Sequence, residues 1–212
     1  MPEPVARSPI APAAPVVVEN GWEVSGRRAG GGLTLTDCTP LTKVQVRAPA
    51  GGQVAASLGA AFGRAARDPE GTLVVGSGPG EWLLLAPPGR AQTLADRLAR
   101  TAAASPGDHA SWVDLTHGRA LIRLCGPCAA GVLAKVCGID LSDGITPDGA
   151  AFRTSVAALA TDVIRDDLGG THSYLLHCER SSGQYLFGAL LSAGAEFGIE
   201  IDGFSPPESE EP

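Results

Sequence analysis

The sequence predicts an α+β fold in which mostly antiparallel sheets carry helices packed on one face. One observation is a succession of strand, helix, hairpin and helix patterns; the other is that this succession occurs twice, in diverged form. The two copies are predicted to span about 31–106 and 109–204, as pseudo-repeats within one domain of residues 31–204.

The first copy begins with residues 43–47, where polar and apolar side chains alternate as in a half-buried strand. Pro49 and the glycines 51–52 break this strand. Residues 73–85 then predict a hairpin with a glycine-rich turn. Two helices complete the copy and are marked by apolar residues at helical spacing: Val54, Leu58, Ala61 and Phe62, then Leu94 and Leu98.

The second copy repeats this order from residues 121–125, which predict a strand that ends at Gly126-Pro127. Residues 161–176 predict its hairpin, with a turn at 166–171. Its helices are marked by Val132, Leu133, Val136 and Cys137, then Leu186 and Leu190. The copies correspond at Pro49 and Pro127, Val44 and Ile122, and Val46 and Leu124.

The two ends of the chain have a different composition. Residues 1–30 are rich in Pro, Ala and Gly, and prolines interrupt regular backbone hydrogen bonding. We therefore predict a flexible N-terminal arm, disordered or ordered only on a partner. Residues 205–212 are predicted to be a disordered acidic tail.

Composition excludes several classes of protein. The 212 residues are 44% hydrophobic, which predicts a globular fold. The formal net charge of −7 argues against nucleic acid and against an anionic membrane surface as partners. No apolar run reaches the length of a membrane span, and the N-terminus has no secretory pattern. A cytoplasmic location is expected, with the five cysteines reduced.

The stretch Cys125-Gly126-Pro127-Cys128 has the spacing of a thioredoxin-like redox site, between a predicted strand and a predicted helix. A helix N-terminus would lower the pKa of the Cys125 thiol. The first copy has Arg47-Ala48-Pro49-Ala50 at the same place, so the turn occurs there without thiols. A structural turn is therefore the favoured interpretation, with Cys125 and Cys128 as the redox candidates.

Two other motifs have a structural and a functional interpretation. The glycines in 76–80 could suggest a phosphate loop, but a strand follows them and phosphate binding requires a helix N-terminus, so a hairpin turn is favoured. His117, with Asp114 and Thr116, could form a hydrogen-bonded catalytic group. No serine or cysteine nucleophile lies near it in the sequence, so a polar cluster at a strand end is favoured.

Metal-ligand residue types occur at His172, His177 and Cys178. Adjacent strand residues point to opposite faces, so His177 and Cys178 are not expected to reach one ion. Structural zinc needs four convergent ligands, and no metal site is predicted.

Arg119 and Arg123 share one strand face with Leu121 and Cys125. This mixture of charge and apolar area would be explained either by an interface or carboxylate-binding surface, or by an ordinary solvated sheet face. Trp82 and Trp112 are expected to be core or interface anchors rather than rings that stack on a cofactor.

Several segments together resemble the gamma subunits of heterotetrameric sarcosine oxidase. Residues 78–88 resemble that family's "GPDEWLL" hairpin, and residues 113–134 its "vDlShgra…lrvsGpdAr.lLa" segment. Residues 181–187 and 196–198 are similar to its closing helix, and Ser8-Pro9-Ile10 to its N-terminal "SPL". The resemblance covers residues 8–204 and extends to the broader folate-binding aminomethyltransferase fold, which includes the glycine-cleavage T-protein.

The resemblance implies a non-catalytic structural subunit that carries no cofactor. No GxGxxG leads into a helix, so a nucleotide fingerprint is also missing from the sequence. The alpha, beta and delta subunits would be the partners and would hold FAD, FMN, NAD, tetrahydrofolate and zinc. The complex would oxidise sarcosine to glycine, pass the one-carbon unit to tetrahydrofolate and produce hydrogen peroxide.

Two departures from the family bear on chemistry. Cys128 stands where the broader family usually has Asp, and the T-protein's "GGxxDD" segment corresponds to Ala158–Asp162, without the glycines. Asp162 and Asp114 are the candidate folate-binding carboxylates, and no catalytic residue is assigned. A free-standing folate-binding protein and a thiol redox protein are the alternative functions.

Overall fold

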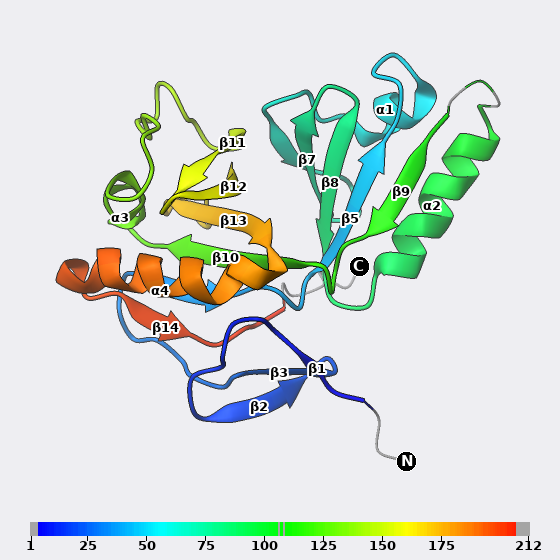
Figure 1. Cartoon of the computed structure of the whole chain (residues 1–212). Coiled ribbons are helices and arrows are strands. Elements are labelled where there is room, and N and C mark those ends of the chain that lie inside the picture. Colours follow the sequence, from blue (N-terminus) through cyan, green and yellow to red (C-terminus); the bar gives the residue numbers. More distant parts are fainter. Residues whose placement is uncertain (1–3, 106, 108, 207–212) are drawn as a thin grey trace.

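The computed structural model describes residues 4–105, 107 and 109–206, and its described strands form three sheets (Figure 1). The five-stranded sheet has the order β6-β7-β8-β5-β9. Its strands are β5 (Thr42–Arg47), β6 (Ala65–Arg67), β7 (Leu73–Gly78), β8 (Glu81–Ala86) and β9 (Ser111–Asp114). The six-stranded sheet has the order β11-β12-β13-β10-β4-β14. Its strands are β4 (Thr34–Asp37), β10 (Arg119–Cys125), β11 (Ala151–Val156), β12 (Leu159–Arg165), β13 (Ser173–Glu179) and β14 (Glu200–Asp202).

The duplication seen in the sequence is also present in the sheets. Four strands of the first copy have the order β6-β7-β8-β5, and four strands of the second have the equivalent order β11-β12-β13-β10. Every pairing within these two sets is antiparallel. The α+β class with mostly antiparallel sheets is confirmed.

The two copies exchange one strand each. β9 belongs to the second copy in sequence but pairs with β5 of the first. β4 precedes β5 in sequence but pairs with β10 of the second copy. Because each sheet is completed by a strand from the other half of the chain, the copies at 31–106 and 109–204 are interlocked.

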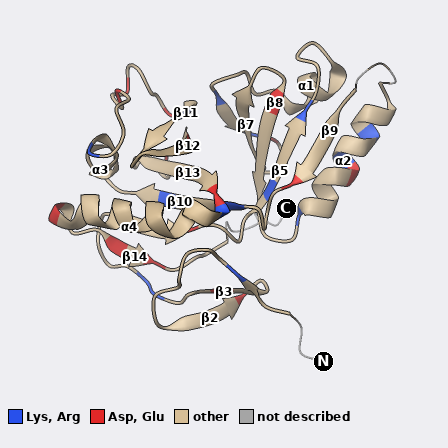
Figure 2. Cartoon of the chain, in the orientation of Figure 1, with Lys and Arg blue, Asp and Glu red and all other residues tan. Residues whose placement is uncertain are grey.

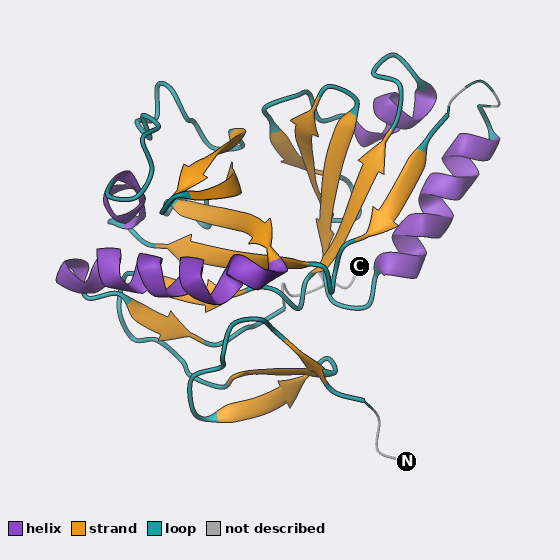
Figure 3. Ribbon diagram, viewed as in Figure 1, coloured by secondary structure: helices purple, strands orange, loops and turns teal. Residues whose placement is uncertain are grey.

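Helices cover the outer face of each sheet (Figure 3). α1 (Gln53–Leu58) and α2 (Ala91–Ala103) pack on the five-stranded sheet, and α3 (Ala129–Ala134) and α4 (Gly183–Gly194) on the six-stranded one. Short 3-10 turns flank α4 at Arg180–Ser182 and Ala195–Phe197. The inner faces meet in a further core that contains Leu73, Leu83 and Leu121. Strands buried on both faces explain the nearly continuous apolar runs in the sequence.

Two predicted helices are shorter than expected. α1 ends at Leu58 because Gly59 takes a left-handed conformation with φ 68°, which closes the helix. Ala61 and Phe62 therefore lie outside it, and Phe62 is 66% exposed. α3 ends at Ala134, so Val136 and Cys137 follow it. Both hairpins and the two closing helices are confirmed.

The prediction of an N-terminal arm without regular structure is wrong for part of residues 1–30. β1 (Ala6–Arg7), β2 (Val16–Glu19) and β3 (Trp22–Ser25) form a small sheet with the order β1-β3-β2. The prolines lie outside these strands, and Asn20-Gly21 forms the two-residue turn between β2 and β3 with positive φ at both positions. Of the predicted acidic tail, residues 207–212 lie outside the described residues.

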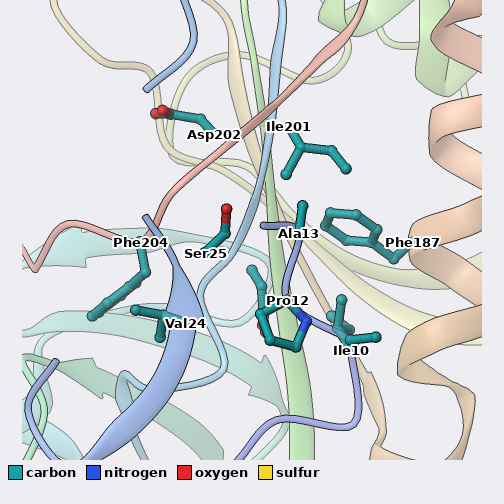
Figure 4. A pocket seen from close by; sticks show the side chains of 11 residues that line it. Ile10, Pro12, Ala13, Val24, Ser25, Phe187, Ile201, Asp202 and Phe204 are labelled. Carbon is teal, nitrogen blue, oxygen red and sulfur yellow. The ribbon is translucent and has the colours of Figure 1, made fainter. Parts of the chain in front are cut away.

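The arm packs on the second copy (Figure 4). Ile10 is 1% exposed. With Pro12 it lines a small cavity of about 20 Å³ shared with Phe187 of α4, Ile201 of β14 and Phe204. Burial of these apolar side chains gives the arm a fixed position despite its proline content.

Candidate functional site

Several charged side chains gather between the two large sheets. A pocket there has about 20 Å³ of free volume. Its polar side chains come from both halves of the chain: Gln45, Ser77 and Glu81 from the first, and Arg119, Arg153, Asp162 and His177 from the second. The interlocked sheets therefore place charged groups against each other where their inner faces meet.

Asp162 is the centre of the hydrogen bonds in this pocket. Its carboxylate contacts Nδ1 of His177 at 3.0 Å and accepts a hydrogen bond from Nε of Arg153 at 2.6 Å. Burial tends to raise the pKa of Asp162, but the bonds from His177 and Arg153 outweigh it, so the pKa lies below its ordinary value. Asp162 is therefore an ionised carboxylate that two partners already occupy.

His177 is a neutral imidazole. Burial lowers its pKa, and Asp162 only partly opposes this effect. Its Nδ1 proton is directed at Asp162, so Nε2 is left as an acceptor. Nε2 is buried and has no hydrogen-bond partner among the described residues.

The remaining charges of the pocket are also paired. Glu81 accepts hydrogen bonds from Arg47 at 2.9 Å and from Ser77 at 3.3 Å, and Arg153 lies 3.7 Å away. Arg119 pairs with Glu179 at 2.6 Å. A free volume of about 20 Å³ holds roughly one water molecule, which Nε2 of His177 would bind. The small free volume and the pairing of the charged side chains are typical of a structural hydrogen-bond network.

The second folate candidate, Asp114, has a local role at the end of β9. Its carboxylate accepts a hydrogen bond from the Thr116 backbone N–H at 2.8 Å. The Thr116 hydroxyl accepts one from the Lys43 backbone N–H at 3.1 Å. The His117 ring stacks on Trp22 of the arm, with ring centroids 4.8 Å apart. The structure therefore contains the polar cluster that the sequence predicts at a strand end. The pocket that contains Asp162 is not lined by Asp114.

Cys125 and Cys128 lie where the sequence predicts, at the end of β10 and just before α3. Both are free thiols. Burial raises the pKa of Cys125, an effect opposite to thiolate activation. Gly126 between them has φ 143°, and a Cβ there would collide with the backbone of Gly32. The turn therefore requires glycine for a packing reason that does not involve the thiols.

Arg119 and Arg123 occupy the same face of β10, and both bind carboxylates of this chain. Arg123 donates to Asp166 at 2.7 Å and to the Ser173 hydroxyl. Arg67 of β6 binds the same Asp166 carboxylate. Of the two interpretations left open for this strand face, carboxylate binding holds for Arg123, with a carboxylate from within the chain.

The other motifs have structural roles. Residues 76–80 form the β7–β8 turn, which leads into a strand as expected for a hairpin. Trp82 is a core anchor whose indole N–H donates to the Ala60 carbonyl at 2.8 Å. Trp112 is partly buried against the same core.

Cys178 lies in the outer core of the six-stranded sheet, on the opposite face from His177, as the strand period predicts. Among the described residues, no three His, Cys, Asp or Glu side chains are grouped to hold a metal ion.

Sequence reasoning missed two buried cations. Lys43 has no solvent exposure, and its ammonium donates to the carbonyls of Thr39 at 2.6 Å and Leu41 at 2.8 Å. Arg165 is 3% exposed and pairs with Asp143 and Asp167. Lys43 occupies a polar position of an alternating strand, so the sequence pattern indicates exposure, whereas β5 lies between β8 and β9 in the interior of its sheet.

The charged residues are distributed over both halves of the chain, and acidic and basic residues are interspersed along each half (Figure 2). None of the helices in the described ranges combines the length and apolar character that a bilayer span requires.

Comparison with known proteins places this architecture in a class. Residues 69–207 match the family described as the GCVT N-terminal domain. The aminomethyltransferase of the glycine cleavage system from Bartonella henselae superimposes with a TM-score of 0.66 over 89% of this chain and 55% of its own, at 18% identity. The fold is therefore that of the aminomethyltransferase class.

The more similar relatives define the particular family. The sarcosine oxidase gamma subunit of Corynebacterium sp. (strain U-96) is 32% identical over 90% of this chain and 91% of its own. A chain from the heterotetrameric sarcosine oxidase of Corynebacterium sp. U-96, solved with pyrrole 2-carboxylate, superimposes with a TM-score of 0.68. That match is 29% identical and covers 82% of this chain and 89% of the solved one. The chain belongs to the family of sarcosine oxidase gamma subunits, and the resemblance drawn from the sequence is confirmed.

Proposed function

We propose that this chain is the structural gamma subunit of a cytoplasmic heterotetrameric sarcosine oxidase. The assembled complex oxidises sarcosine to glycine, transfers the one-carbon unit to tetrahydrofolate and releases hydrogen peroxide. FAD, FMN, NAD, tetrahydrofolate and zinc are bound by the alpha, beta and delta partners. This chain supplies surface and shape to the assembly, with no reacting group of its own.

The observation that carries the proposal is the near full-length similarity to a gamma subunit, at 32% identity over 90% of the chain. The state of the polar groups between the sheets also supports it. Asp162, the residue nearest in sequence to a catalytic carboxylate of the fold, is paired with the Arg153 guanidinium and hydrogen-bonded to the His177 ring. A carboxylate held in this way is a poor base and a poor ligand for a further donor.

The dimensions of the chain support a dependent role as well. It covers 55% of the length of the aminomethyltransferase that shares its fold. The pocket between its sheets has room for about one water, whereas a small-molecule site has a volume of roughly 300 Å³ or more. A protein that resembles about half of an aminomethyltransferase, and whose described residues enclose a pocket of about one water between the sheets, suits a place beside a larger subunit.

Co-expression with the candidate partner subunits tests the proposal. With this chain present, we expect a stable complex that produces hydrogen peroxide from sarcosine and depends on tetrahydrofolate for one-carbon transfer. Without it, recovery of the complex should fall sharply. A complex that assembles and turns over fully in its absence would contradict the structural role.

Two assays on the purified full-length chain separate the alternative functions. Micromolar affinity for a reduced folate, measured by calorimetry, would favour a free-standing folate-binding protein. Thiol-dependent insulin reduction that is lost in Cys125→Ser would favour a redox protein. The proposed function predicts a negative result in both assays.

A further inference from the structure

The small sheet of the N-terminal arm has an unusual free edge. β2 lies at the edge of the order β1-β3-β2, on the outside of the molecule (Figure 1). Val16, Val17 and Val18 are 50%, 41% and 61% exposed. Proteins normally protect such edges with charges, bulges or prolines inside the strand, since an apolar edge pairs readily with other chains.

The hydrogen-bond pattern shows which backbone groups of β2 are free. Gly26 donates to the Pro15 carbonyl, and Ala6 donates to the Gly21 carbonyl, so odd-numbered residues of β3 face β1 and even-numbered ones face β2. In the antiparallel register, Val17 opposite Val24 and Glu19 opposite Trp22 are then the hydrogen-bonded pairs.

The backbone N–H and C=O groups of Val16 and Val18 consequently point away from β3. No described residue accepts or donates to them. They form two donor and acceptor pairs at the spacing of a strand, flanked by apolar side chains on both faces. This geometry fits an extended polypeptide, because only another strand presents matching groups at the same repeat.

We infer that the free edge of β2, residues 16–19, receives an extended segment of a partner subunit, which adds a fourth strand to the arm sheet. The inference rests on the proposed function, because it assigns a partner surface within that assembly. The occupant is a strand with apolar side chains that cover Val16 and Val18 on one face and Val17 on the other.

The length of β2 decides between a partner subunit and a second copy of this chain. Four residues in each of two copies, joined edge to edge, bury far less than the roughly 1,200 Å² of a stable specific interface. Such a strand pair is stable only when a larger contact already holds the two polypeptides together. A neighbouring subunit of the heterotetramer provides that contact, and a self-dimer through this edge does not.

Hydrogen exchange on the free chain and on the assembled complex tests the inference directly. In the free chain, the Val16 and Val18 amides should exchange at nearly unprotected rates, and the Val17 and Glu19 amides should already be slow. On assembly, we expect Val16 and Val18 to slow by about tenfold or more while Val17 and Glu19 change little. Unchanged exchange at Val16 and Val18 in an intact complex would overturn the inference and leave the proposed function standing.

A pair of substitutions separates the backbone from the side chain. Val18→Pro removes an outward-facing N–H without loss of a hydrogen bond to β3 and puts a ring in place of the side chain; proline is tolerated on an edge strand and keeps the preceding residue extended. Val18→Thr keeps both the N–H and the branched shape. We expect Val18→Pro to weaken association with the partners by about tenfold, Val18→Thr to be nearly neutral, and both free chains to melt like wild type.

Two further results would count against the inference. If wild-type chain and partners form no complex at all, the proposed function fails, and the inference fails with it because no partner subunit occupies the edge. If the free chain dimerises in light scattering and its Val16 and Val18 amides are protected in the dimer, the occupant is a second copy and the inference is wrong.

Discussion

Arg67 and Asp166 join the two copies of the repeat: one guanidinium nitrogen of Arg67 in β6 lies 3.0 Å from each oxygen of the Asp166 carboxylate. Arg123 of β10 reaches the same carboxylate at 2.7 Å. A single acidic side chain thus pairs with one arginine from each sheet. This contact and the exchange of β4 and β9 tie the two halves of the chain together.

Asp166→Asn is therefore expected to lower the free energy of unfolding by about 3 kcal/mol, because the largely buried guanidinium of Arg123 loses its counter-charge. Denaturant unfolding of the full chain measures this. The control is Glu196→Gln, which breaks the exposed pair with Lys135 and should cost less than about 0.5 kcal/mol. Equal effects of the two variants would contradict the assigned role of Asp166.

Gly126→Ala is expected to destabilise the chain by at least about 2 kcal/mol. The position has φ 143°, and the new Cβ would collide with the Gly32 carbonyl and the Leu33 backbone. Gly51→Ala is the matched control, since its Cβ would meet nothing within 4 Å. Similar melting temperatures for both variants would show that the turn before α3 does not depend on glycine.

The thiols should differ in reactivity in an order set by burial. Cys128 is exposed and should be alkylated first, followed by the half-buried Cys125. Burial raises the pKa of Cys38 and of Cys178 to about 11, so both should stay unmodified until the chain unfolds. Mass-spectrometric timing of iodoacetamide labelling at pH 8 gives the order. Faster labelling of Cys125 than of Cys128 would revive the redox alternative.

Lys43 should make stability depend on pH. Burial lowers its pKa from 10.5 to about 7, although Asp37, Cys38 and Asp114 partly oppose this and Arg180 adds to it. Between those values the unfolded chain binds one more proton than the folded chain, so stability rises with pH, by up to about 1.4 kcal/mol per unit. The window from pH 7 to 8 lies below the ordinary pKa of a thiol, about 8.5, and so limits ionisation of the cysteines in the unfolded chain.

The measurement is the free energy of unfolding of wild type and Lys43→Met across that window. The wild-type curve should rise relative to the variant curve as pH increases. Two parallel curves would mean that Lys43 has the same protonation in the folded and unfolded chain.

Asp162→Asn distinguishes a structural carboxylate from a catalytic one. The change removes the charge that Arg153 and His177 share, and should cost about 1–3 kcal/mol of stability. Turnover and folate dependence per assembled complex should stay at wild-type values. Loss of folate-dependent transfer in a complex that still assembles would assign Asp162 to the chemistry.

The sequence was most informative where a single segment determines its own structure. The hairpins at 73–85 and 161–176 and the helices through Leu94 and Leu186 follow from apolar period and turn glycines, and all four are present. Apolar spacing places the ends of α1 and α3 too late, because it continues past both helices. At α1 the helix is closed by Gly59, a cap that apolar spacing does not reveal. In the arm, the prolines led to a prediction without regular structure, although Asn20-Gly21 is a sequence signal for a hairpin turn.

Long-range partners were beyond the sequence pattern. Nothing in residues 34–37 or 111–114 indicates that each strand joins the sheet of the other copy. The burial of Lys43 against backbone carbonyls is likewise not indicated by the strand pattern. Asp162, Arg153 and His177 meet through the register within the six-stranded sheet, where Asp162 lies opposite Arg153 of β11 and opposite His177 of β13. The family resemblance identified the class because it rests on the order and spacing of several segments over residues 8–204. No local motif with a chemical role was needed for it.

Native mass spectrometry of the co-expressed assembly tests the central claim most directly. The account predicts that the intact assembly contains this chain bound to its partner subunits. When the assembly is dissociated in the spectrometer, the separated chain should have the mass of the polypeptide alone, with neither folate nor flavin. A free chain that retains a small molecule, and that the partners neither bind nor require, would contradict the account.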